Sequence, residues 1–131
     1  MDYETLIQKA LEMLDFSYVP YSHFHVGAAL LSKSGKVYGG CNIENSSYSP
    51  TNCAERTAFF KAVSEGVKDF DAIAVVGGHD GIVKDFCPPC GVCRQVMREF
   101  CSKDFKIILA KTTKEYKVYT LEELLPESFS L

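Results

Sequence analysis

Two short cysteine motifs constrain this chain more than any other feature of its sequence. The first is Cys53-Ala54-Glu55-Arg56, and the second is Pro89-Cys90-Gly91-Val92-Cys93. Three cysteine thiolates can bind zinc and leave a fourth position open, which distinguishes a catalytic zinc from a structural one. Water bound at such a position ionises near neutral pH, and a nearby glutamate can transfer its protons. The two motifs therefore predict a hydrolytic zinc site.

Each motif also has a simpler interpretation. A single Cys-x-x-Cys pair at a helix start is typical of redox proteins with thioredoxin-like folds. Cys87 lies three residues before Cys90, so a closed structural zinc site with four cysteines is an alternative. Asn52-x-x-Glu55 resembles a helix capping box, which would give Glu55 a purely structural role. The combination of Cys-x-Glu with a later Pro-Cys-x-x-Cys favours the catalytic interpretation.

The composition predicts a single soluble domain that spans residues 1–131. The chain has 131 residues, 47% of them hydrophobic, which suffices for one core. The N-terminus is acidic and no apolar run reaches membrane-spanning length, so we expect a cytoplasmic protein with no membrane partner. Its six cysteines are then expected to be thiols or metal ligands. A net charge of −3 without a cluster of Lys and Arg disfavours nucleic acid as a partner and favours a small neutral substrate.

Hydrophobic periodicity predicts alternating helices and strands. The expected helices cover about 6–14, 53–64 and 91–100, and Thr120 with Glu123 forms a capping box for a short final helix. The expected strands cover 24–31, 36–41, 71–76, 105–110 and 116–119. On the third helix, the expected apolar face consists of Val92, Val96, Met97 and Phe100. This pattern predicts an α/β fold, a three-layer α/β/α sandwich around a mixed five-stranded sheet.

Taken together, the two cysteine motifs resemble those of the zinc-dependent cytidine deaminase superfamily. The resemblance extends over almost the whole chain. Three further segments are similar to the short cytidine deaminases that act on free nucleosides: 21–30, 40–45 and 124–129. The resemblance implies a cytidine deaminase-like fold and a homotetramer with active sites shared between subunits.

The resemblance also implies a reaction. Cys53, Cys90 and Cys93 would hold one zinc ion per subunit, and Glu55 would shuttle protons. Cytidine and 2′-deoxycytidine would be hydrolysed to uridine and 2′-deoxyuridine with release of ammonia, a reaction of pyrimidine salvage. Glu55 would move a proton from the zinc-bound water to N3, the hydroxide would attack C4, and Glu55 would then protonate the departing amine.

Five other residues resemble substrate-binding positions of the family. They are Phe24 in the pyrimidine pocket, Asn42 and Glu44 at the ribose, Ala54 as a further substrate-binding residue, and Phe129, which would enter a neighbouring subunit's site. Without the family, Phe24 would be interpreted as a core aromatic, Asn42 and Glu44 as a polar turn, and Phe129 as terminal packing.

The remaining polar and sulfur-containing side chains receive other roles. Arg56 would be a solvated helix residue in the absence of a metal, but near thiolates it would donate hydrogen bonds to them and offset their charge. Cys41 and Cys101 are expected to be buried thiols, and no histidine matches a ligand position.

Two other functions remain open at this point. A blasticidin-type nucleoside deaminase would share the zinc signature, although Phe24 and Asn42-x-Glu44 argue against it. A non-catalytic, zinc-stabilised binding module would use Cys87 to close the metal site.

Overall fold

A mixed five-stranded sheet lies at the centre of the computed structural model, which describes residues 1–131. The strand order is β2-β1-β3-β4-β5. β3 and β4 pair in parallel, and all other neighbours are antiparallel. The strands are β1 (Phe24–Ser32), β2 (Val37–Cys41), β3 (Phe70–His79), β4 (Lys106–Ala110) and β5 (Tyr116–Thr120).

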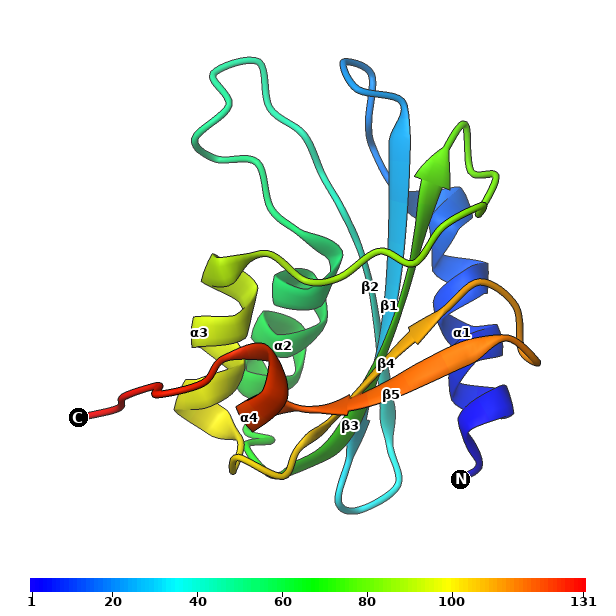
Figure 1. The fold of residues 1–131 in the computed structure, drawn as a ribbon. Helices are drawn as coiled ribbons and strands as arrows, with labels where there is room; N and C mark the ends of the chain where they lie inside the picture. Colours follow the sequence, from blue (N-terminus) through cyan, green and yellow to red (C-terminus); the bar gives the residue numbers. More distant parts are fainter.

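Helices cover both faces of this sheet and complete the three predicted layers (Figure 1). On one face lies α1 (Tyr3–Met13), which continues into a short 3-10 helix at Leu14–Phe16. The other face carries α2 (Ala54–Ser64), α3 (Gly91–Phe100) and α4 (Leu121–Leu124). The predicted capping box of Thr120 and Glu123 is present at the start of α4.

The alternation of side chains along the strands divides the core into two clusters. In β1, Ala28 and Leu30 belong to the cluster under α2 and α3, whereas Ala29 and Leu31 belong to the cluster under α1. β3 and β4 alternate in the same way, because successive residues of a strand point to opposite faces. The central strands are therefore buried on both faces.

Two expectations from the sequence were wrong in detail. β3 extends to His79 rather than ending near Val76, because Gly77 and Gly78 continue the ladder with β1. Val92 does not join the buried face of α3, since it lies in the first turn of that helix and is 58% exposed.

The start of α2 lies directly against β2. A Cβ atom on Gly40 would collide with the carbonyl oxygen of Ala54 and lie 2.7 Å from the backbone nitrogen of Ala58. Only a glycine in β2 permits this approach, because any larger residue would push the helix away from the sheet. Gly40 therefore helps to fix the position of the Cys53-Ala54-Glu55 segment.

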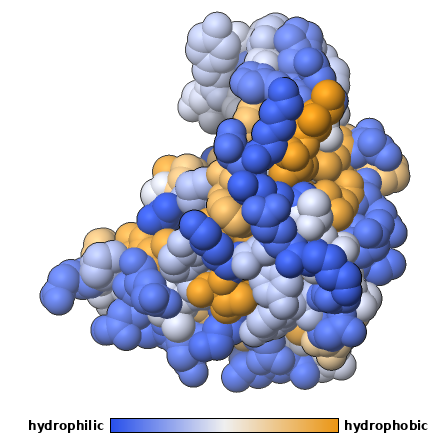
Figure 2. Space-filling view, turned by 45° about the vertical axis from the view of Figure 1, so that its right-hand side comes forward, coloured by the Kyte–Doolittle hydropathy of each residue, from blue (hydrophilic) through white to orange (hydrophobic).

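The surface is mixed in character. Figure 2 shows several separate hydrophobic patches among hydrophilic residues on the face that it views. The large exposed apolar side chains include Phe60, Tyr48 and Phe129. None of the helices combines the length and the apolar character needed to cross a bilayer.

Candidate metal and substrate site

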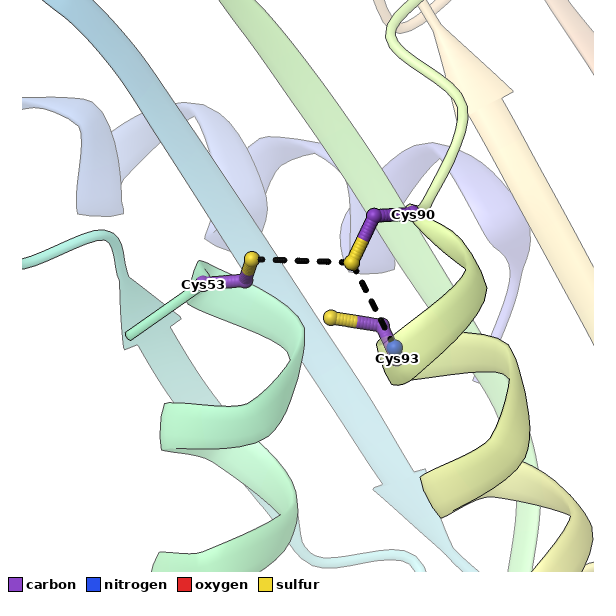
Figure 3. Close-up of side chains that lie close together, drawn as sticks. All are labelled: Cys53, Cys90 and Cys93. Carbon is purple, nitrogen blue, oxygen red and sulfur yellow. Dashed lines mark hydrogen bonds between the residues drawn. The ribbon is translucent and has the colours of Figure 1, made fainter. Parts of the chain in front are cut away.

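Three cysteines from two helices meet at one point. Cys53 is the N-cap residue of α2, Cys90 is the N-cap residue of α3, and Cys93 lies in the first turn of α3. Their Sγ atoms all lie within 4.8 Å of one another. Figure 3 shows the three side chains converging from the ends of the two helices. The sequence motifs thus predicted both the helix starts and the cluster.

The cluster has the dimensions of a zinc site. The Sγ atoms of Cys53 and Cys90 are 3.8 Å apart. Tetrahedral coordination with Zn–S bonds of ~2.3 Å places sulfurs at about this separation. The positive ends of two helix dipoles also point at the cluster, which favours thiolates there. The donor set and its spacing therefore fit one zinc ion held by Cys53, Cys90 and Cys93.

Cys87 is not part of this cluster. Its Sγ lies over Gly77 of β3, at 2.9 Å from where a Cβ of that glycine would be. Burial raises the pKa of the Cys87 thiol to about 12. The alternative of a closed four-cysteine site is therefore not supported.

Arg56 contacts the cluster from α2. Its Nη2 donates a hydrogen bond to Sγ of Cys53 at 3.2 Å. Hydrogen bonding from Cys93, together with this bond from Arg56, lowers the pKa of the Cys53 thiol and stabilises the thiolate. The buried Nε of Arg56 has no hydrogen-bond partner within the chain.

Glu55 is a buried carboxyl group beside the metal ligands. It is 4% exposed, and burial raises its pKa to about 7. The N-cap residue of α2 is Cys53, which makes no side-chain capping bond, so the alternative capping box of Asn52 and Glu55 is wrong. A carboxyl group with a pKa near neutrality can both accept and release a proton at physiological pH.

A pocket of about 170 Å³ joins the cluster to several predicted substrate-binding residues. It brings together the metal ligands Cys53 and Cys90 with Glu55. The other predicted residues in its lining are Asn42, Glu44 and Ala54.

Asn42 and Glu44 are held in place by backbone groups. The Asn42 amide donates to the carbonyl of Phe24 at 2.8 Å and accepts from the N–H of Val26 at 2.9 Å, which links the end of β2 to β1. Oε1 of Glu44 accepts from the N–H groups of Tyr21 and Ser22 at 3.0 and 3.1 Å. Hydrogen bonds from Ser22 and Tyr21 lower the pKa of this carboxyl group.

Phe24 and Phe129 lie outside this pocket. Phe24 packs edge-on against His79, with ring centroids 5.1 Å apart, and lines a neighbouring cavity. Phe129 is 68% exposed in a C-terminal segment that leads away from the sheet (Figure 1). The structure therefore does not bring Phe129 to the site of its own subunit.

Val26 and Pro88 also line the pocket and were missed by the sequence interpretation. Val26 follows Phe24 by two residues in β1, so strand alternation could have identified it. No local pattern pointed to Pro88, because its position depends on how the β3–α3 loop folds back.

Comparison with known proteins agrees with this geometry. The family model described as "Cytidine and deoxycytidylate deaminase zinc-binding region" matches residues 1–109. The chain belongs to the cytidine deaminase family. Members of this family are zinc-dependent hydrolases, and the three-cysteine cluster is the corresponding metal site.

Cytidine deaminases of known sequence and structure resemble the whole chain. A cytidine deaminase of Sporosarcina psychrophila is 52% identical over 130 residues, covering 99% of this chain and 93% of that protein. The crystal structure of a cytidine deaminase from Burkholderia pseudomallei superposes with a TM-score of 0.90 at 43% identity, covering 98% of this chain and 100% of that one. A blasticidin-S deaminase of Bacillus cereus is less similar, at 33% identity over 129 residues, with 95% and 90% coverage.

Proposed function

We propose that this protein hydrolyses cytidine and 2′-deoxycytidine to uridine and 2′-deoxyuridine, with release of ammonia. The observation that carries the proposal is the placement of buried Glu55 beside the three-thiol cluster, in one pocket with Asn42 and Glu44. We further propose that residues 1–131 act as one domain, in the cytoplasm.

The reaction requires a group that activates water and a group that moves protons. Cys53, Cys90 and Cys93 would hold the zinc. When bound, the zinc supplies a Lewis acid that lowers the pKa of water toward neutrality. The positive N-termini of α2 and α3 and the Arg56 guanidinium offset the negative charge of the thiolates.

Glu55 would perform the proton transfers. Its carboxylate accepts a proton from the attacking water and delivers it to N3 of the pyrimidine, which makes C4 more electrophilic. A C–O bond forms at C4, and the C–N bond to the amine breaks. Glu55 carries the second water-derived proton to the departing amine, so that water and cytidine become uridine and ammonia. The raised pKa of about 7 suits a group that must be both base and acid in one cycle.

Asn42 and Glu44 would select a nucleoside over a free base. One oxygen of Glu44 is used by the N–H groups of Tyr21 and Ser22, which leaves its second oxygen to accept from a ribose hydroxyl. A Glu44→Gln variant should raise KM for cytidine about tenfold, since a hydrogen bond to a charged group contributes roughly 1.5–3 kcal/mol. An unchanged KM would remove the ribose-binding role.

We also propose a homotetramer in which Phe129 enters a neighbouring subunit's site, beside a pyrimidine in contact with Phe24. The small domain and its exposed apolar side chains on α2 and α3, Phe60 and Val92, support an assembly. Light scattering tests this directly, and a monomeric mass would exclude shared sites. Phe129→Ala should then raise KM without changing zinc content.

Measurement of ammonia release tests the main proposal. Cytidine and deoxycytidine should be turned over, whereas cytosine and cytidine monophosphate should react poorly. Zinc content measured on the same samples should approach one ion per chain. Turnover of blasticidin S in preference to cytidine would favour the blasticidin-type alternative, and zinc without any turnover would favour a binding module.

A further inference from the structure

Residues 83–88 of the β3–α3 loop, two of which form one wall of the pocket, have no hydrogen bonds to hold them. Cys87 and Pro88 from this loop line the pocket beside Glu55. Residues 83–88 make no backbone or side-chain hydrogen bond to any other part of the chain. In Figure 1 the loop crosses the sheet from the end of β3 to the start of α3. Side-chain packing must therefore hold this wall in place.

Phe86, directly before the wall, lies beneath two lysines. The Nζ atoms of Lys111 and Lys117 each lie 4.7 Å from the centroid of its ring. Lys117 is paired with Leu109 across the β4–β5 ladder, and Lys111 lies two residues beyond Leu109. By strand alternation both lysines project on the same face of the sheet as Leu109, which is in the core cluster that Phe86 packs against.

The two lysines have little else to bind. Lys111 shares a partly exposed ion pair with Glu115 at 3.5 Å, and Lys117 has no ion-pair partner. Two ammonium groups over one ring repel each other, and this arrangement is favourable only if an electron-rich group lies near both. The ring's electron-rich face supplies this, because a cation over it is attracted to the aromatic quadrupole.

The other end of the wall is anchored separately. Nε of Arg94 donates to the carbonyl of Pro89 at 2.7 Å, and its Nη1 donates to the carbonyl of Leu124 at 2.6 Å. Cys87 and Pro88 thus lie between two fixed points, Phe86 and Pro89. Loss of the Phe86 contact would free one end and leave Cys90, with its zinc, anchored at the other.

We propose that Phe86, held by Lys111 and Lys117, is a positioning residue that fixes Cys87 and Pro88 against the pyrimidine ring of the substrate. This inference rests on the proposed deaminase function. The contact of Phe86 with the two lysines would set KM through the shape of the pocket wall. It would leave zinc binding and the Glu55 proton transfers unchanged.

Kinetics of lysine variants test the cationic part of the contact. Lys117→Met keeps the aliphatic stem and loses the charge, so KM for cytidine should rise about two- to fivefold, as expected for loss of one cation–π contact. Both kcat and zinc affinity, measured by competition with a chromogenic chelator, should stay within about twofold. Lys117→Arg should restore the wild-type KM. Lys114→Met is the matched control, since Lys114 pairs with Glu4 instead.

A double-mutant cycle separates this contact from general packing. Phe86→Leu keeps an apolar side chain but removes the ring, so Lys117→Met should have no further effect in that background. An effect of Lys117→Met of equal size in both backgrounds would overturn the proposal.

A second readout does not depend on turnover. In the zinc-loaded protein Cys53, Cys90 and Cys93 are ligands, which leaves Cys87 as the half-buried thiol and Cys41 and Cys101 as buried references. Iodoacetamide labelling followed by peptide mapping should show faster modification of Cys87 in Lys117→Met, with unchanged references. Equal rates at Cys87, or a parallel rise at Cys101, would overturn the positioning role. Faster Cys87 labelling in a protein that does not deaminate cytidine would instead count against the proposed function alone.

Discussion

Nη2 of Arg56 lies 3.2 Å from Sγ of Cys53, one helical turn along α2 from this zinc ligand. The contact places a permanent positive charge beside thiolates whose summed charge exceeds that of the metal. It also ties the orientation of the ligand to the backbone of the helix that carries Glu55.

Removal of this guanidinium should weaken zinc binding. Arg56→Ala is expected to lower zinc affinity about tenfold or more, the usual effect of losing a partner that hydrogen-bonds to a ligand. Chelator competition measures the change. Arg98→Ala is the matched control, because Arg98 bonds to Ser128 and is not near the cluster. Equal zinc affinities for Arg56→Ala and wild type would show that the helix dipoles alone stabilise the thiolates.

Glu55→Gln should separate catalysis from structure. The amide has the size of the carboxyl group but cannot carry the proton, so kcat should fall by ~10²-fold or more. Zinc content and the thermal midpoint should be retained, because a neutral group replaces one that burial already disfavours as an anion. Glu65→Gln, at the C-terminal end of the same helix, should leave kcat unchanged. A near-normal rate for Glu55→Gln would assign the proton transfers to another group.

The Glu44 carboxylate should contribute to stability in a pH-dependent way. The Tyr21 and Ser22 hydrogen bonds favour its ionised form, so its pKa is lower in the folded than in the unfolded chain. The contribution is therefore present above about pH 4.5 and is lost as the pH falls through the lower, folded-state pKa. Urea unfolding of wild type and Glu44→Gln should show a difference in the free energy of unfolding at pH 7 that shrinks as the pH falls below about 4.5. A difference that does not change with pH would mean that the amide disturbs the turn sterically.

Cys87→Ser should keep both zinc and turnover. The Sγ of Cys87 lies over Gly77 and outside the three-thiol cluster, and serine preserves its size. Cys90→Ser is the comparison, and it should lose zinc and activity together. Zinc analysis by mass spectrometry under native conditions distinguishes the two. Loss of zinc from Cys87→Ser would instead support the structural zinc site with four cysteine ligands.

The parts that the sequence predicted well are those specified locally. Cys90 and Cys93 lie on one turn, so their spacing alone places both sulfurs on the same side of a metal. Hydrophobic periodicity likewise predicted strands at the positions of β1 and β4. The fold class followed from the order of these elements.

The missed features depend on contacts between distant segments. The strand was expected to end before Gly77 and Gly78, but β1 supplies a partner strand that extends β3 through them. Asn52 and Glu55 match a capping box, yet burial beside the cysteines gives Glu55 a different environment. The contact of Phe86 with Lys117 joins a loop to an edge strand, which no local pattern encodes.

The division of the core by the sheet has a consequence for engineering. The metal ligands and Glu55 lie at the starts of α2 and α3, whereas α1 packs on the opposite face of the sheet through Leu6, Ile7 and Ala10. Substitutions that improve packing under α1 can raise the melting temperature while the sheet separates them from the metal. Libraries aimed at thermal tolerance should therefore target that half of the molecule, and libraries aimed at substrate range should target the β3–α3 loop.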